Sequence, residues 1–467
     1  MSLFNSLQLW AAQKIGAQIL RQTENTYQRI NQGTVTWQGV DASKQVEDGY
    51  NGNDIVYSCI KLIADKAKLA PWYEYKVVDK KAYKEYRQKT AQPDKVTDWK
   101  HVNELHTKAL ELVSKQTKIS DLLIYPNADD TWSDLIEAAV SYKLITGNDY
   151  IYGKTITAGV NKGLPNSLHV LPAQYMQILT KMAAFPVEAV GYALMMGKIV
   201  NFTRSEILHD KFFNPDWDAN GMQLYGLSPL QAAAKVLTRS NQGKEYAVSA
   251  YQNGGPPGVL FVKKDQGFNG VDLTAQVDLV KERLKQYEGS KNANKIPVSG
   301  FEIGYQQIGL SPVDMDILDA EIFDMRAICN IYGVPSQLLN DPNNKTYNNQ
   351  AEGEKALTTR CALPLLTALR DNFNRKLKND WNAGSDTVID FDLSVYSELE
   401  GNKLDQVNWL EKSLLPLYRR YEILGESVPE WMDEATRNTI LVPSGYQPLE
   451  ETLMPVPDLQ NPYNATP

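Results

Sequence analysis

The sequence predicts an α+β fold, and three observations indicate it. Apolar residues recur at helical spacing from Ile55 to Ala67. Between residues 150 and 202 follow short β-branched or aromatic segments bounded by Gly, Pro and Asn, which is typical of strands. Helical patterns return from Ser228 onward. The helix and the strands that follow it indicate an α+β first half.

Composition sets the broad class. The chain has 467 residues, 43% hydrophobic and 22% charged, as in a globular protein of several domains. Its 48 basic and 56 acidic residues give a net charge of −8, which argues against a protein that coats DNA by neutralising phosphates. Three cysteines form no disulfide framework, so a reducing compartment is expected. The most apolar stretch, Met182 to Gly197, is too short and too interrupted to span a membrane.

The first half contains the expected sheet. The first 54 residues should include a peripheral helix, and the helix from Ile55 should end before Pro71. A Lys-rich stretch, Lys76 to Lys108, has little periodicity and reads as a solvated excursion. Thr131 and Asp134 resemble a capping box that starts the next helix. Strands are then expected at Tyr150 to Thr157, Leu168 to Leu171, Tyr175 to Leu179 and Ile199 to Phe202.

The second half has helices around a small unit. A helix from Ser228 should stop at the Asn253-Gly-Gly-Pro-Pro-Gly sequence. A strand (Val259 to Val262), a helix and strands near Ile296 to Ile303 follow. The clearest helix runs from Met315 to Tyr332 and ends at Gly333-Val-Pro335. After a polar loop, a long helix should bend at Pro364, because proline removes one helical hydrogen bond. Val388 to Leu393 should be a strand, and further helices and a Pro-rich tail should follow.

The sequence offers no catalytic, metal or cofactor site. Five residues separate Gly147 from Gly153, where a phosphate-binding loop needs four. The closest histidine pair, His101 and His106, is not at the spacing that puts two imidazoles on one helical face. No Cys-x-x-Cys or Gly-x-Ser-x-Gly sequence occurs. We therefore predict a protein that is not an enzyme and has no cofactor.

The Met315 to Tyr332 helix has an unusual charge pattern. Against one basic residue, Arg326, it has a set of acidic residues in or just before it: Asp314, Asp316, Asp319, Glu321 and Asp324. One interpretation is a solvated amphipathic helix. The other is a helix that lines an aqueous passage for a polyanion, since acidic walls repel phosphates and let DNA slide.

Six segments together resemble bacteriophage portal proteins, in particular the HK-type family of long-tailed phages. They are YSCIKLIADKAKLAPWYEY (57–75), LLIYPNADDTWSDLIEAAVSYKLITGNDYIY (122–152), LPNSLHVLPAQYMQI (164–178), EILHDK with YGLSPLQAA (206–233), YQNGGPPGVL (251–260) and IGLSPVDMDILDAEIFDMRAICNIYGVPSQLL (308–339). The Leu-Ser-Pro helix start, the Gly-Gly-Pro-Pro-Gly break and the Gly-Val-Pro-x-x-Leu-Leu end are jointly specific. The Lys-rich excursion and the acidic C-terminus depart from the family pattern.

The resemblance implies a portal-like architecture. An α/β wing (55–227) would follow an N-terminal peripheral segment (1–54). A two-helix stem (228–255 and 313–338) would enclose a small α/β clip (256–312). A tunnel loop (339–347), the kinked helix with a wing strand (348–395), helical crown (396–440) and Pro-rich extended tail (441–467) would complete the chain.

The resemblance also implies a function and partners. Usually twelve subunits form a ring at one capsid vertex, through which double-stranded DNA is packaged and ejected. The ring would assemble in the host cytoplasm, join the major capsid protein in the virion, and dock the terminase large subunit and later the head-tail adaptor. Contact with DNA should be non-specific, and no membrane is involved.

Three sets of residues would serve the channel. The tunnel loop would comprise Leu339, Asn340, Asp341, Pro342, Asn343, Asn344, Lys345, Thr346 and Tyr347. The acidic stem residues would line the channel, and the clip would carry the basic residues Lys263, Lys264, Lys291 and Lys295. Two alternatives stay open: a hydrolytic, carbohydrate-active enzyme, prompted by 25 Tyr and nine Trp, and a structural subunit of a tail or baseplate.

Overall fold

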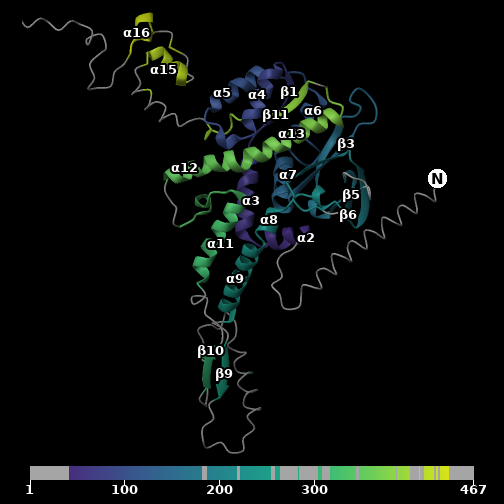
Figure 1. Cartoon of the computed structure of the whole chain (residues 1–467), viewed down its shortest axis with the longest axis vertical. Coiled ribbons are helices and arrows are strands. Elements are labelled where there is room, and N and C mark those ends of the chain that lie inside the picture. Colours follow the sequence, from purple (N-terminus) through teal and green to yellow (C-terminus); the bar gives the residue numbers. More distant parts are fainter. Residues whose placement is uncertain are drawn as a thin grey trace, which may run out of the picture. The chain divides into compact units, whose positions relative to one another are not determined.

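The computed structural model describes most of the chain between Asp41 and Ile440. The described residues are 41–180, 187–217, 221–253, 258–262, 282, 303–307, 316–342, 347–384, 386–399, 410, 415–424, 428–429 and 432–440. They fall into two units (Figure 1). One comprises Met1–Thr97 and Val102–Val395, and the other Asp98–His101 and Tyr396–Pro467. The expected N-terminal helix and Pro-rich tail lie outside the described residues.

Two capped helices form the centre of the first unit. In α3 (Asp54–Ala67), the side-chain oxygen of Asn53 accepts hydrogen bonds from the Ile55 and Val56 amides at 3.1 Å. In α7 (Trp132–Thr146), Thr131 and Asp134 form the expected capping box. Gly147, at φ 80°, ends α7, since a left-handed residue suits glycine. Four short helices flank this pair: α2 (Ala42–Lys44), the π-helix η1 (Gln45–Asn51), α6 (Lys118–Leu122) and the 3-10 helix η3 (Ala173–Tyr175).

Three antiparallel sheets of three strands each make the fold α+β, as predicted. Their orders are β11-β1-β2, β4-β3-β8 and β5-β6-β7. Four of the strands coincide with the expected ones: β3 (Asn148–Thr155), β4 (Pro165–Leu171), β5 (Met176–Thr180) and β7 (Lys198–Thr203). The fifth expected strand is β11 (Thr387–Phe391). The sequence analysis missed β1 (Trp72–Val77), β2 (Leu110–Leu112), β6 (Ala189–Met196) and β8 (Ile207–Lys211).

The Lys-rich stretch, predicted to be a solvated excursion of little periodicity, contains regular structure that was not predicted. It contains two helices, α4 (Lys80–Thr90) and α5 (Trp99–Ala109), separated by the 3-10 helix η2 (Pro93–Lys95). Tyr86, Val102 and Ala109 are fully buried. A few apolar positions anchor these helices, while their lysines stay in water, so the composition hid the pattern.

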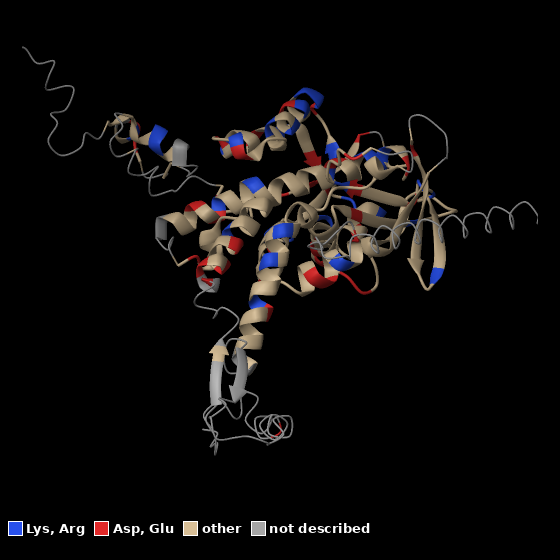
Figure 2. Cartoon of the chain, turned by 60° about the horizontal axis from the view of Figure 1, so that its bottom comes forward, with Lys and Arg blue, Asp and Glu red and all other residues tan. Residues whose placement is uncertain are grey.

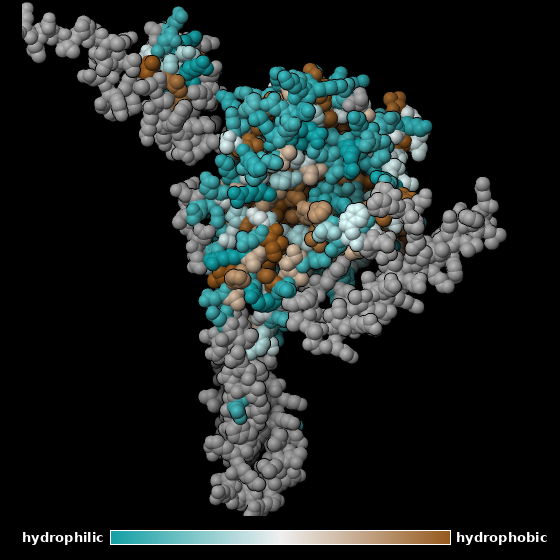
Figure 3. Space-filling view, in the orientation of Figure 1, coloured by the Kyte–Doolittle hydropathy of each residue, from teal (hydrophilic) through white to brown (hydrophobic). Residues whose placement is uncertain are grey.

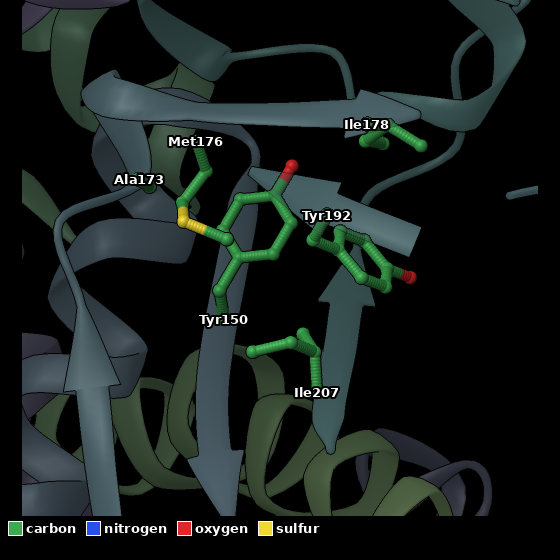
Figure 4. Packing of buried hydrophobic residues seen from close by; sticks show 6 residues of the cluster. All are labelled: Tyr150, Ala173, Met176, Ile178, Tyr192 and Ile207. Atoms are coloured by element: carbon green, nitrogen blue, oxygen red, sulfur yellow. The ribbon is translucent and has the colours of Figure 1, made fainter. Parts of the chain in front are cut away.

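Aromatic side chains tie the sheets and helices together. Figure 4 shows Tyr150 of β3 packed near Met176, Ile178 and Tyr192, with the Tyr150 and Tyr192 rings 5.8 Å apart at an edge-to-face angle. This cluster joins sheet β4-β3-β8 to sheet β5-β6-β7. A second aromatic group connects β1, α7, α13 (Leu363–Asn379) and β11, and its members are Trp72, Trp132, Phe373 and Phe391.

Two longer helices and a β-ribbon follow the sheets. The 3-10 helix η4 (Met222–Leu224) leads to α8 (Pro229–Ala232), which is capped by Ser228, and then to α9 (Ala234–Asn253). β9 (Gly258–Val262) matches an expected strand and pairs with β10 (Ile303–Gln307), which begins where the expected strand ends. α11 (Ile317–Tyr332) follows, as expected. The predicted clip helix lies outside the described residues.

The long helix is interrupted before Pro364 rather than at it. α12 (Tyr347–Ala356) passes into a π-helical stretch, η7 (Leu357–Ala362), and then into α13 (Leu363–Asn379) (Figure 1). Pro364 lies in the first turn of α13, a position that tolerates a missing N–H. The predicted irregularity is therefore present, but its form is a wider turn just upstream of the proline.

The second unit contains short helices, as expected for residues 396–440. α15 (Leu417–Leu424) and α16 (Glu434–Asn438) are its described helices, and Pro416 bridges to Ile440. Asp433 caps α16 by accepting a hydrogen bond from the Thr436 amide at 3.0 Å.

Candidate functional site

The helices α9 and α11 lie side by side and antiparallel (Figure 1). Arg239 Nε lies 2.9 Å from Asp324 Oδ1, and Lys244 Nζ lies 3.5 Å from Glu321 Oε1. Numbers rise along α9 while their partners' numbers fall along α11, which fixes the antiparallel direction. Figure 2 shows basic residues along α9 and acidic residues along α11. Charge pairing thus sets the register of the two helices.

The α9 helix is fixed to the first unit through Asn53. The amide nitrogen of this buried side chain donates to Ser240 Oγ at 3.1 Å and to Asn241 Oδ1 at 2.7 Å. Its oxygen caps α3. Lys244 also forms an ion pair with Asp54, the first residue of α3. One asparagine and one lysine therefore join the helix pair to the sheet-bearing body.

Buried thiols and a tyrosine line the same junction at the end of α11. Cys59 Sγ of α3 lies 3.9 Å from Cys329 Sγ of α11, and Tyr332 Oη donates to the Leu144 carbonyl of α7 at 3.4 Å. Cys361 Sγ lies 3.2 Å from the Gly333 carbonyl. All three cysteines are free and buried. Burial raises the pKa of the Cys361 thiol to about 11, so it is a thiol at neutral pH.

The predicted acidic lining is only partly solvated. Asp316 and Asp319 are exposed, and Glu321 is partly exposed beside Lys244. Asp324 is 2% exposed and paired with Arg239, so it cannot line an aqueous passage, and the structure corrects that prediction. Asp314 lies outside the described residues. Asp324 has a partner because Arg239, 85 positions earlier in the chain, reaches across from α9.

The exposed face of α11 also carries an apolar residue that was not predicted from the sequence. Phe323 is 61% exposed and lies one turn after Asp319. The guanidinium carbon of Arg239 lies 5.2 Å from the centre of its ring, a cation–π arrangement. Figure 3 shows hydrophobic side chains on the surface around α11 and α3. The available signal for this residue was the presence of an aromatic side chain among the charged residues of the helix.

The beginning of the predicted tunnel loop is ordered and anchored. Leu339 ends the 3-10 helix η6 (Ser336–Leu339), and Asn340 follows with φ 60°. Asp341 is buried and accepts two hydrogen bonds from Arg326, each 2.8 Å long. Within the predicted tunnel loop, Leu339 thus belongs to η6, and Asp341 is held by Arg326.

The rest of that loop is described only at its ends. Pro342 is exposed, and Tyr347 begins α12. The loop residues Asn343, Asn344, Lys345 and Thr346 lie outside the described residues, as do the clip residues Lys263, Lys264, Lys291 and Lys295.

Comparison with known proteins identifies the family. The model of the phage portal protein family matches residues 103–414, which is more than half of the chain. The chain belongs to the phage portal protein family. Among the proteins similar to this portal protein, an uncharacterized protein of Rickettsia bellii (strain RML369-C) is 27% identical over 356 residues, 75% of this chain and 80% of the relative. The probable portal protein of Streptomyces phage phiC31 is 24% identical over 278 residues, 56% of this chain and 57% of the relative.

A solved structure supports the fold of this portal protein. The neck of a native GTA particle, computed with C12 symmetry, contains a chain that matches with a TM-score of 0.54 and 23% identity. The match covers 86% of this chain and 98% of that one. A chain in the virion of a native gene transfer agent particle has the same fold, with a TM-score of 0.53 and 24% identity, and the match covers 85% of this chain and 96% of that one.

Within the described residues, no group of three His, Cys, Asp or Glu side chains could hold a metal ion. No helix in the described ranges is long and apolar enough to cross a membrane.

Proposed function

We propose that twelve copies of this portal protein form a closed ring at one capsid vertex. The family match over residues 103–414 carries this proposal, and the similarity to a chain in a neck of C12 symmetry supports the number. Head-to-tail contacts between identical subunits close into a ring when the rotation between neighbours divides a full turn.

The stem pair α9 and α11 would surround the DNA channel. Asp316, Asp319 and Glu321 would give the channel wall negative charge at the exposed face of α11. Such a wall repels phosphates, so double-stranded DNA would pass without being held by counterion release. Contact with DNA would be weak, sensitive to salt and independent of sequence.

The remaining regions would contact other proteins of the particle. The clip (256–312) would dock the terminase large subunit during packaging and the head-tail adaptor afterwards, with Lys263, Lys264, Lys291 and Lys295 as its basic residues. The crown (396–440) would face the capsid interior, and the wing would contact the major capsid protein. Assembly would take place in the host cytoplasm before the ring becomes part of the virion.

Mass photometry and negative-stain imaging of the purified protein test the ring. We expect closed rings of about twelve subunits at several salt concentrations. Monomers, dimers or open filaments at every salt concentration would contradict the proposal.

A pair of charge reversals tests the channel wall. Asp319→Lys would place one added lysine per subunit on the exposed face of α11, and Glu245→Lys makes the same change on an exposed position of α9. We expect Asp319→Lys rings to bind DNA with a steeper salt dependence and to give fewer DNA-filled heads than Glu245→Lys rings. Equal behaviour of the two variants would argue against α11 as the channel wall.

A further inference from the structure

A charged clamp ties the start of the predicted tunnel loop to α11. Arg326 Nε lies 2.8 Å from Asp341 Oδ2, and Arg326 Nη2 lies 2.8 Å from Asp341 Oδ1. Ser336 Oγ donates a third hydrogen bond to this carboxylate at 2.9 Å. The pair raises the pKa of the Arg326 guanidinium above its ordinary value. A bidentate pair fixes orientation as well as distance, because two parallel hydrogen bonds allow one relative geometry.

The clamp requires the chain to double back along α11. Gly333, at φ 73°, ends the helix after Tyr332, and η6 and Asn340 then reverse the direction. Arg326 lies six residues before Tyr332, which is about 9 Å along the helix axis. The predicted loop therefore starts beside the body of α11 instead of at its end.

The far end of the loop is tied to the same short helix. Gln337 Nε2 of η6 donates to the Asn349 carbonyl near the start of α12 at 2.7 Å. Gly353 allows this close approach, since a Cβ there would lie 2.9 Å from Gln337 Nε2. Ser336 and Gln337, adjacent residues of η6, thus contact the two sides of the loop.

We propose that Arg326 and Asp341 are positioning residues that make the base of the tunnel loop, Leu339 to Pro342, and α11 move as one unit. The inference rests on the proposed function, because it assigns the displacement of the loop to passing DNA. A push on the loop is transmitted to the stem through the ion pair, and a shift of the stem moves the loop base by the same route. Without the clamp, the loop base would be held on its far side by Gln337 while its near side was released from α11.

Three variants and a matched control test the clamp in assembled rings. Arg326→Gln and Asp341→Asn each remove one partner, and the double variant removes both without leaving a buried unpaired charge. Arg239→Gln is the control, because it also leaves a buried aspartate of α11, Asp324, without its arginine partner while it keeps the Arg326–Asp341 pair. The measurements are ring formation, amide hydrogen exchange of residues 340–350, and the yield of DNA-filled heads.

We expect rings from all four proteins, and roughly tenfold faster exchange at 340–350 in the three clamp variants but not in the control. Filled heads should fall in the clamp variants, including the double. Unchanged exchange at 340–350, or an equal fall in filled heads with Arg239→Gln, would overturn the clamp. So would recovery of filled heads in the double variant, since that would show that only an unpaired charge had been harmful.

Arg326→Lys covers the case in which the glutamine variant does not fold. It keeps the charge and loses the second parallel hydrogen bond, so intermediate exchange is expected, and wild-type exchange would overturn the clamp. A failure of the proposed function has a different signature, because the wild-type protein itself would then form no rings or no filled heads.

Discussion

The sheet-bearing body, which we propose to be the wing, and the helix pair α9 and α11, which we propose to be the stem, bury charge in different ways. In the wing, Arg370 and Asp390 are both fully buried, with Arg370 Nη1 3.3 Å from Asp390 Oδ1. The Arg370 guanidinium carbon lies 5.7 Å from the ring centres of both Tyr86 and Phe391. On the stem side, Asp324 of α11 and Asp341, which follows η6, are buried, but their partners Arg239 and Arg326 are 54% and 42% exposed.

The difference concerns what happens when a pair breaks. A fully buried charge cannot replace its partner with water. The Arg370–Asp390 pair therefore either keeps its geometry or breaks at a large cost in free energy. A half-exposed arginine can be rehydrated at modest cost, so the stem pairs fix a geometry that can still be changed. Breaking a pair should therefore cost more free energy in the sheet-bearing body than at α9 and α11.

Removing the buried arginine of the wing should have the largest effect. Arg370→Met should lower the free energy of unfolding by about 3–5 kcal/mol, because Asp390 is left buried without a compensating charge. Urea unfolding at one fixed protein concentration measures it. Arg370→Met with Asp390→Leu should recover much of the loss, whereas equal stabilities of the single and double variants would contradict this account.

A buried carboxyl of the wing should make stability depend on pH. Asp149 on β3 lies opposite Asp210 on β8, and burial, reinforced by the Asp210 charge, raises its pKa well above the ordinary value of 3.8. A raised pKa stabilises the fold below about pH 3.8, and this contribution disappears as pH rises toward the pKa in the folded state.

The variant Asp149→Asn should therefore be more stable than the wild type at pH 7 and should lose that advantage toward pH 4. Thermal unfolding across this pH range measures the difference. A difference that is constant with pH would show that Asp149 is ionised in the fold. Its neighbour Asp210 lies 2.6 Å from Lys143 Nζ and accepts a hydrogen bond from Asn372 at 2.8 Å.

In the stem, Arg239→Gln should cost about 1–2 kcal/mol, because water reaches the arginine site while Asp324 loses its partner. Added salt should reduce this difference, since exposed charges are screened. Urea unfolding at low and high salt provides the measurement. A loss as large as that of Arg370→Met would remove the distinction between wing and stem.

The smallest effect is expected for a surface network in the wing. Glu137 of α7 accepts hydrogen bonds from Lys61 at 3.0 Å and Lys68 at 2.6 Å on α3, and all three side chains are about one-third exposed. Glu137→Gln should cost only about 0.2–1 kcal/mol in urea unfolding. Because Glu137 and Arg370 belong to the same unit, this variant separates burial from location as the cause of the larger effects.

The helices and strands that depend on local sequence patterns were the ones that the sequence predicted correctly. The capping box at Thr131 and Asp134 is present, and the helical spacing of Ile55 to Ala67 gave α3 nearly to the residue. The α4 helix was missed because its buried residues, Ala82, Tyr86 and Thr90, are few among many lysines. Here tertiary burial stabilises a helix whose composition suggested solvated coil.

The site residues show the limit of a reading from one sequence. Acidic residues on the α11 helix were visible, but the burial of Asp324 depends on Arg239 from another helix. Asp341 looked like a turn former, and only the reversal after Gly333 brings it to Arg326. Residues that meet only through tertiary folding show no periodic pattern in the sequence. The family resemblance therefore indicated the region of the site, and the structure was needed to identify the contacts within it.

The π-helical stretch at Leu357–Ala362 has a consequence for how this chain can change over time. Each residue of an α-helix turns the chain by about 100°, so a single insertion would rotate everything on one side of it. A wider turn takes in the additional residue locally and leaves both neighbouring helices in place. Deleting one residue between Leu357 and Ala362 would restore a regular helix but turn α12 away from η6, so homologues that lack the wider turn should also differ at Gln337 and Gly353.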